Sequence, residues 1–150
     1  MNLKQSKSPI LIALADDWPE DVALLVGQIG IAFAQLTREV YLATKRIEGA
    51  TIEEWERENK SDQLGKWCCE IRKRFATETA LISLIDRVDM VAKQRHDIFH
   101  AIWGRHRDGH LGRWRDGSDL GIDPGPMDQV LQEIRCLRDA INSRSRPEKG

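Results

Sequence analysis

Apolar residues recur along much of this chain at the three- and four-residue spacing of amphipathic helices. The clearest series predicts a helix over residues 19–48, which opens with Pro19 and two acidic residues. Its apolar positions are Val22, Val26, Ile29, Phe33, Leu36, Val40, Ala43 and Ile47. Gly49 is the predicted C-cap, and Gly27 and Gly30 predict close approach of a neighbouring element.

Three further main helices follow from the same pattern. We expect one over residues 62–75, one over 78–104, and one that begins after Pro126. Residues 51–54, TIEE, have the form of a capping box, which predicts a short additional helix carrying Trp55. These helices are expected to pack as an antiparallel bundle.

Glycines gather in one irregular region. Six of the 11 glycines fall in residues 104–125, and two of them form Asp-Gly turn signals. We therefore predict an all-α fold, an antiparallel bundle of four main helices with a long Gly-rich loop or a small hairpin before the last one. The bundle domain would span residues 19–142, after an N-terminal segment 1–18 and before a frayed tail 143–150.

Composition narrows the classes of function. The 150 residues are 41% hydrophobic and 31% charged, which is typical of one folded domain. The formal net charge of −1 excludes a global electrostatic attraction to DNA or to an anionic membrane. No apolar run approaches the ~18 residues that a transmembrane helix needs. Because Cys68 and Cys69 are adjacent, the three cysteines do not form a disulfide framework, and we expect a cytoplasmic protein.

One arginine occupies an unusual position. On a helical wheel, Arg95 falls in the middle of the apolar face predicted for helix 78–104. That face is formed by Leu84, Val88, Ala92, Phe99 and Ile102. A buried and unpaired guanidinium would cost several kcal/mol, so Arg95 should pair with a buried acceptor, face a dimer seam, or line an anion-binding cleft. The wheel separates Arg95 from His100 by about 140°, so one regular helix does not aim both at one point.

The surrounding segment is rich in cations and rings. Residues 93–115 hold six basic residues against two acids, together with all four histidines of the chain and two tryptophans. This mixture suits phosphate groups and unstacked bases. The alternative is an ordinary solvated loop with ion pairs to Asp108, Asp116 and Asp119, and composition alone favours that interpretation.

Residues 95–100, RHDIFH, have the form R-x4-H with a polar residue directly after the arginine. This segment resembles the motif of the HEPN (higher eukaryotes and prokaryotes nucleotide-binding) family, in which four to six residues separate Arg from His. The family also favours Asn, Asp or His just after the Arg. As a fold pattern the resemblance covers residues 19–142, and its specific part is the six-residue motif.

The resemblance implies a metal-independent ribonuclease, without a cofactor, that acts as a homodimer with a composite cleft. By that likeness, His100 would be the general base or acid at the ribose 2′-hydroxyl. Arg95 would hold the scissile phosphate, and His96 would orient the other two. Residues that would contact the RNA are Lys93, Trp103, Arg105 and Arg107.

Two alternatives stay open. The first is a non-catalytic helical dimer or partner module, either antitoxin-like or nucleotide-binding. Its partner would be an antitoxin or a nucleotidyltransferase, and the motif arginine Arg95 would form a buried ion pair. The second is a metal-binding protein, because His96 and His100 are four residues apart on one helix face. The third metal ligand would come from Asp89, His106 or His110.

Overall fold

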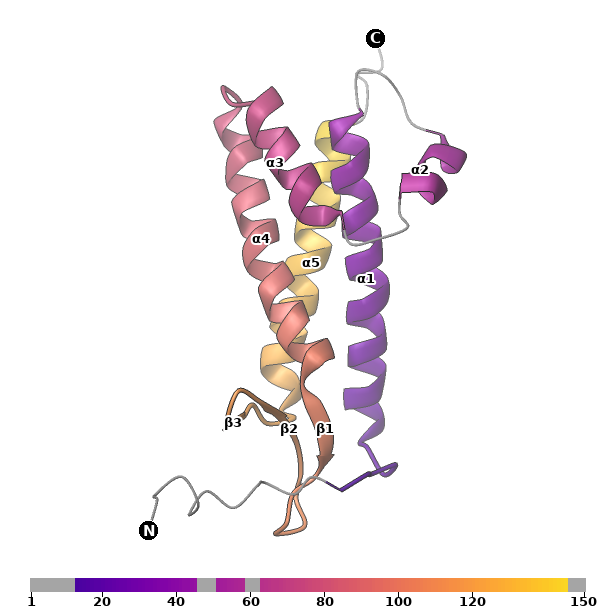
Figure 1. Ribbon diagram of the computed structural model, residues 1–150, viewed down its shortest axis with the longest axis vertical. Helices are drawn as coiled ribbons and strands as arrows, with labels where there is room; N and C mark the ends of the chain where they lie inside the picture. Colours follow the sequence, from indigo (N-terminus) through magenta and orange to yellow (C-terminus); the bar gives the residue numbers. More distant parts are fainter. Residues whose placement is uncertain (1–12, 46–50, 59–62, 146–150) are drawn as a thin grey trace, which may run out of the picture.

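The computed structural model describes residues 13–45, 51–58 and 63–145 (Figure 1). Along these ranges the elements are α1 (Glu20–Thr44), α2 (Ile52–Glu58), α3 (Leu64–Arg74), α4 (Thr79–His100), β1 (Ile102–Arg105), β2 (Leu111–Arg115), β3 (Ser118–Asp119) and α5 (Pro124–Ser145). The long helices α1, α4 and α5 run along the long axis of the molecule. The strands lie at one end of this bundle, and α2 lies beside the other end of α1.

The core lies between α1, α3, α4 and α5. Helices α1 and α5 pack along most of their length, and α4 packs chiefly against α5 and α3. Ile29, Leu36, Ile71, Ile85 and Ile134 are all fully buried at this centre. Burial of each such side chain contributes about 1.5–3 kcal/mol to folding, so the apolar stripes are what hold the helices together.

The predicted fold class is confirmed in its coarser form. Most of the described residues are helical and the long helices form a bundle, but the all-α class does not account for the three strands. Residues 104–125, expected as a long loop or a small hairpin, carry most of a three-stranded antiparallel sheet in the order β1-β2-β3. No helix in the described ranges is long and apolar enough to cross a lipid bilayer.

The predicted end of the helix over residues 78–104 is wrong. Helix α4 ends at His100, Ala101 is extended (φ −68°, ψ 154°), and the chain continues directly as β1. Two side chains turn to different sides here: Ile102 is 59% exposed, whereas the indole of Trp103 packs against the core. The Trp103 Nε1–H donates to the Ile98 carbonyl at 2.9 Å, which satisfies an acceptor in the last helical turn.

The other boundaries follow local signals more closely. Helix α1 begins after Pro19 as predicted but ends at Thr44, and the predicted C-cap Gly49 lies outside the described residues. The capping box is confirmed: the Glu54 N–H donates to Thr51 Oγ1 at 3.1 Å, and the Thr51 N–H donates to Glu54 Oε2 at 3.4 Å. Of the tail expected to be frayed, residues 143–145 continue α5 as far as Ser145, and the rest lies outside the described residues.

The sheet is joined to the start of α1. In the hairpin, Trp103 pairs with Arg113 and Gly104 with Gly112, and the outer edge of β1 forms a two-way backbone bridge from Arg105 to Ala13. Between β2 and β3, Asp116 (φ 49°) and Gly117 (φ 82°) form a two-residue turn of the Asp-Gly kind that twists with the strands.

Candidate functional site

Arg95 lies on α4, at the side of the helix that faces α1. Its guanidinium carbon is 4.8 Å from the centre of the Phe33 ring and 4.7 Å from that of Phe99. Guanidinium groups are attracted to the electron-rich faces of aromatic rings. The buried Nε of Arg95 has no hydrogen-bond partner in the described part of the chain. The arginine is therefore held by two rings rather than by a hydrogen bond at Nε.

The predicted position of Arg95 on the buried seam is wrong. The residues of α4 that are buried are Leu81, Ile85, Val88, Val91 and Ile98. This stripe lies to one side of the predicted one, because α4 packs mainly against α5 and α3 and less against α1. Phe99 is 38% exposed, and Arg95 is half-buried at the boundary between core and surface. At that boundary a guanidinium does not need a buried counter-charge.

Arg95 and His96 line one pocket. It has a volume of about 610 Å³ and lies between α4, Phe33 of α1, and the first turn of α3, with Lys93 also in its wall. Among the described residues His100 is not part of this wall, but its ring packs on that of His96 with centroids 4.1 Å apart. The structure thus brings the first two motif residues to one pocket, and His100 adjoins it through His96.

The pocket wall carries charges of both signs, with the cations Lys93 and Arg95 among them. Two acids also line it, Asp89 and Asp97, and each contacts an arginine from elsewhere in the chain. Asp89 forms an ion pair with Arg72 of α3, and Asp97 forms one with Arg115 of β2 at 3.0 Å. Each of these arginines also contacts a second acid, Asp86 or Asp116, so the ion pairs hold the pocket carboxylates in place and offset their charge only in part.

The other predicted RNA contacts lie at the sheet end of α4. Trp103 meets Trp18 edge-on, with ring centroids 5.5 Å apart. Arg105 forms an ion pair with Asp17 and donates from Nη1 to the Gly109 carbonyl at 2.6 Å. The hydrogen bond from Arg105 lowers the pKa of Asp17. Arg107 is exposed in the turn between β1 and β2. Trp103 and Arg105 are therefore engaged in contacts within the chain.

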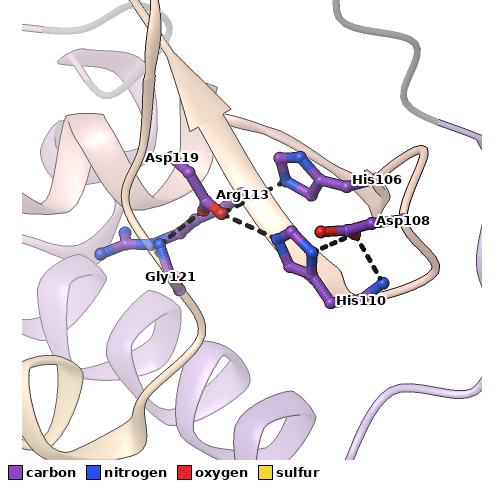
Figure 2. A network of polar contacts seen from close by, with 6 residues as sticks. All are labelled: His106, Asp108, His110, Arg113, Asp119 and Gly121. Carbon is purple, nitrogen blue, oxygen red and sulfur yellow. Dashed lines mark hydrogen bonds and ion pairs between the residues drawn. The ribbon is translucent and has the colours of Figure 1, made fainter.

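A second polar cluster lies on the sheet, and the sequence analysis did not identify it as a unit. His106, His110 and Asp119 place three potential metal-ligating atoms within 4.8 Å of one another (Figure 2). Within the described ranges, these three residues form the cluster of at least three potential metal ligands. His96 and His100 have no third ligand among the described residues that completes such a cluster. The signal in the sequence was the pair His-x3-His around the turn of a hairpin, with Asp119 joined to it by the pairing of β2 with β3.

Hydrogen bonds set the protonation tendencies of this cluster. His110 contacts Asp119 and Asp108, and these contacts raise its pKa, with Asp119 the larger cause. The pKa of Asp119 is lowered, first by the N–H of Gly121 and then by His110. The rings of His106 and His110 are stacked, with centroids 4.3 Å apart and planes inclined by 9°.

Comparison of the chain with protein-family models, curated proteins and solved structures finds no match. Function therefore has to be argued from the two clusters themselves. The pocket on α4 offers cations and imidazoles to an anion, and the cluster on the sheet offers two imidazoles and a carboxylate to a cation.

Proposed function

We propose that this chain is a metal-independent endoribonuclease of the HEPN type. In this proposal Arg95 binds the scissile phosphate, His100 exchanges the proton of the ribose 2′-hydroxyl, and His96 orients them. The observation that supports it best is the pocket on α4, where Arg95 and His96 lie side by side and the nearby acids are paired elsewhere. The imidazole of His100 adjoins this pocket through its contact with His96.

The chemistry requires only groups of these kinds. A base removes the proton from the 2′-hydroxyl, the 2′-oxygen attacks the phosphorus, and the 5′-oxygen leaves with a proton from an acid. The products are a 2′,3′-cyclic phosphate and a 5′-hydroxyl, without water or an oxidant. Imidazole exchanges protons near neutral pH. A guanidinium stays charged and matches phosphate oxygens with two N–H groups, which stabilises the charge that develops.

The proposal includes a homodimer, because Arg95 and His100 are separated by about 140° around α4. One copy of the helix does not aim both side chains at one phosphate, whereas two copies can. An exposed α1 face, formed by Leu24, Gly27 and Ile31, supports this part of it. Leu24 is 62% exposed and Ile31 64% exposed, and the spacing of three and four residues places them in one row. Gly30, beside this row, is the position where a Cβ would lie 3.3 Å from the Phe99 ring. The α1 face therefore borders the rings that hold Arg95.

Cleavage of RNA by the purified full chain tests the proposal. We expect the wild type to cut RNA in the presence of a chelator and to leave 2′,3′-cyclic phosphate ends, while the matching DNA stays intact. His100→Ala should reduce the rate at least ~100-fold, since positioned proton transfer contributes about 10²–10⁴. Arg95→Ala should reduce it by at least ~100-fold as well, since loss of one group that stabilises the developing charge costs about 10²–10³. Lys73→Ala, which removes an exposed cation from α3, is the matched control and should cleave at the wild-type rate.

Circular dichroism of each variant separates lost chemistry from lost folding. Normal activity in folded Arg95→Ala and His100→Ala would contradict the ribonuclease assignment. A wild type that forms dimers through the α1 face but cuts no RNA would support the second candidate, a non-catalytic dimer or partner module. The exposed apolar row on α1 is the observation that favours this candidate.

A further inference from the structure

The cluster on the sheet has the spacing of a metal site. Asp119 Oδ2 lies 3.1 Å from His110 Nε2 and 3.5 Å from His106 Nε2 (Figure 2). Zinc binds nitrogen and oxygen at about 2.0–2.2 Å in tetrahedral geometry, which places neighbouring donor atoms roughly 3.3 Å apart. The two separations lie on either side of that value. The two imidazoles are stacked in this structure, so an ion shared by all three atoms requires one ring to rotate about its side-chain bonds until both nitrogens face it.

The groups around the cluster orient two of its donors. The carboxylate of Asp108 contacts Nδ1 of His110, so Nε2 of the same ring faces Asp119. Metal-binding histidines commonly hold a carboxylate or a carbonyl with their second nitrogen in this way. The Gly121 N–H donates to Asp119 Oδ1 at 2.8 Å, which leaves Oδ2 toward the imidazoles.

The third donor is buried and contacts Asp119 without forming a hydrogen bond to it. The side chain of His106 is only 9% exposed, and its Nε2 has no hydrogen-bond partner within the ranges that the structure describes. Buried polar atoms are nearly always hydrogen-bonded, so this nitrogen points to a ligand. Gly112 on the paired strand makes room for it, because a Cβ there would lie 2.3 Å from His106 Nε2.

We propose that His106, His110 and Asp119 bind one divalent transition-metal ion of the zinc class. Two imidazoles and a carboxylate suit zinc better than calcium or magnesium, which favour oxygen ligands alone. The fourth position is left to solvent. Because two ligands flank the β1–β2 turn and the third lies on β3, the ion fastens β3 to the hairpin. None of the three ligands belongs to the α4 pocket, so this site is independent of the ribonuclease proposal.

Zinc titration of the full chain tests the site. The protein is produced without a histidine tag, treated with a chelator, and titrated with Zn²⁺ in a calorimeter. We expect one ion per wild-type chain, and Asp119→Asn should weaken its binding at least ~100-fold while it keeps the size of the side chain. Asp108→Asn should weaken binding about 10–100-fold, as loss of a group that orients a ligand does. The double variant His96→Ala/His100→Ala is the matched control and should bind as the wild type does.

A second measurement keeps the test valid if a variant folds poorly. Gly112→Ala leaves all three ligands in the sequence but occupies the space of the His106 ring, so it should also lose zinc binding. Zn²⁺ should raise the melting temperature of the wild type and leave that of Asp119→Asn unchanged. The proposal is overturned if the wild type binds no zinc, if Asp119→Asn binds it as tightly, or if the His96/His100 double variant is the one that loses it.

Discussion

Cys68 and Cys69 are neighbours in the sequence and differ sharply in chemistry. Cys68 is fully buried on the inner face of α3, whereas Cys69 is exposed, as is Cys136 on α5. Burial, helped by the nearby charge of Asp89, raises the pKa of the Cys68 thiol to about 12. Thiolate is the reactive form, so at neutral pH Cys68 lacks both access to solvent and the ionised sulfur.

We expect a thiol reagent at neutral pH to modify two of the three cysteines quickly in the folded protein. The third should react only after a denaturant is added, because a raised pKa keeps the sulfur protonated. Labelling followed by intact mass measurement checks this. Cys69→Ser should leave one fast thiol, whereas Cys68→Ser should leave two. Rapid labelling of all three in the native wild type would contradict the burial of Cys68.

At the scale of single elements, α2 depends on a local device. It has seven residues and would be marginal alone, but the reciprocal hydrogen bonds between Thr51 and Glu54 satisfy two N–H groups at its start. The helix holds Trp55 against Tyr41 of α1 and Trp67 of α3, with ring centroids 5.4 and 5.8 Å apart. The cap and this aromatic cluster together fix α2.

Thr51→Ala should therefore loosen α2 by about 1 kcal/mol, the usual contribution of an N-cap hydroxyl. Hydrogen exchange resolved by residue is the measurement, and faster exchange should be confined to the amides of α2. Thr79→Ala replaces an exposed threonine at the first helical position of α4, after the N-cap position, and should change exchange far less. Unchanged exchange in α2 of the first variant would contradict the role of the cap.

The helices were predictable from sequence where one chain segment contains the whole signal. Pro19 begins α1, the capping box begins α2, and the apolar stripes of α3 and α5 mark their inner faces. The end of α4 was not predictable in this way, because the apolar pair Ile102 and Trp103 fits a helix or a strand equally well. Ile102 and Trp103 form a strand because they pair with β2, residues 111–115.

The candidate sites show the same division. Arg95 and His96 share a pocket because they are consecutive on one helix, and their closeness could be expected from sequence. The rotation of α4 that brings Arg95 to the surface depends on which helices α4 packs against. Likewise, Asp119 meets His106 and His110 only through the pairing of β3 with β2; the Asp116-Gly117 turn signal marks where the chain reverses but not which side chains the pairing brings together.

At the scale of the whole molecule, the α1 face is an apolar row that a single chain leaves uncovered. We expect Ile31→Glu to convert the proposed dimer to a monomer, because a charge in an apolar interface is costly to bury. Light scattering coupled to size exclusion, over a range of protein concentrations, measures this. Met90→Glu is the control, since Met90 is 67% exposed on α4 and should leave the dimer intact. A wild type that stays monomeric at every concentration would contradict the dimer.

The five tryptophans fall into two groups, one around α2 and α3 and one at the sheet. Trp55 and Trp67 lie with Tyr41 beside α2, whereas Trp18 and Trp103 lie at the sheet. Trp114 also lies there, with its ring 6.0 Å from that of His106. The intrinsic fluorescence of the protein is thus the sum of two spatially separate signals. Quenching that originates near the hairpin can be distinguished from melting around α2 once either group of indoles is replaced by phenylalanine.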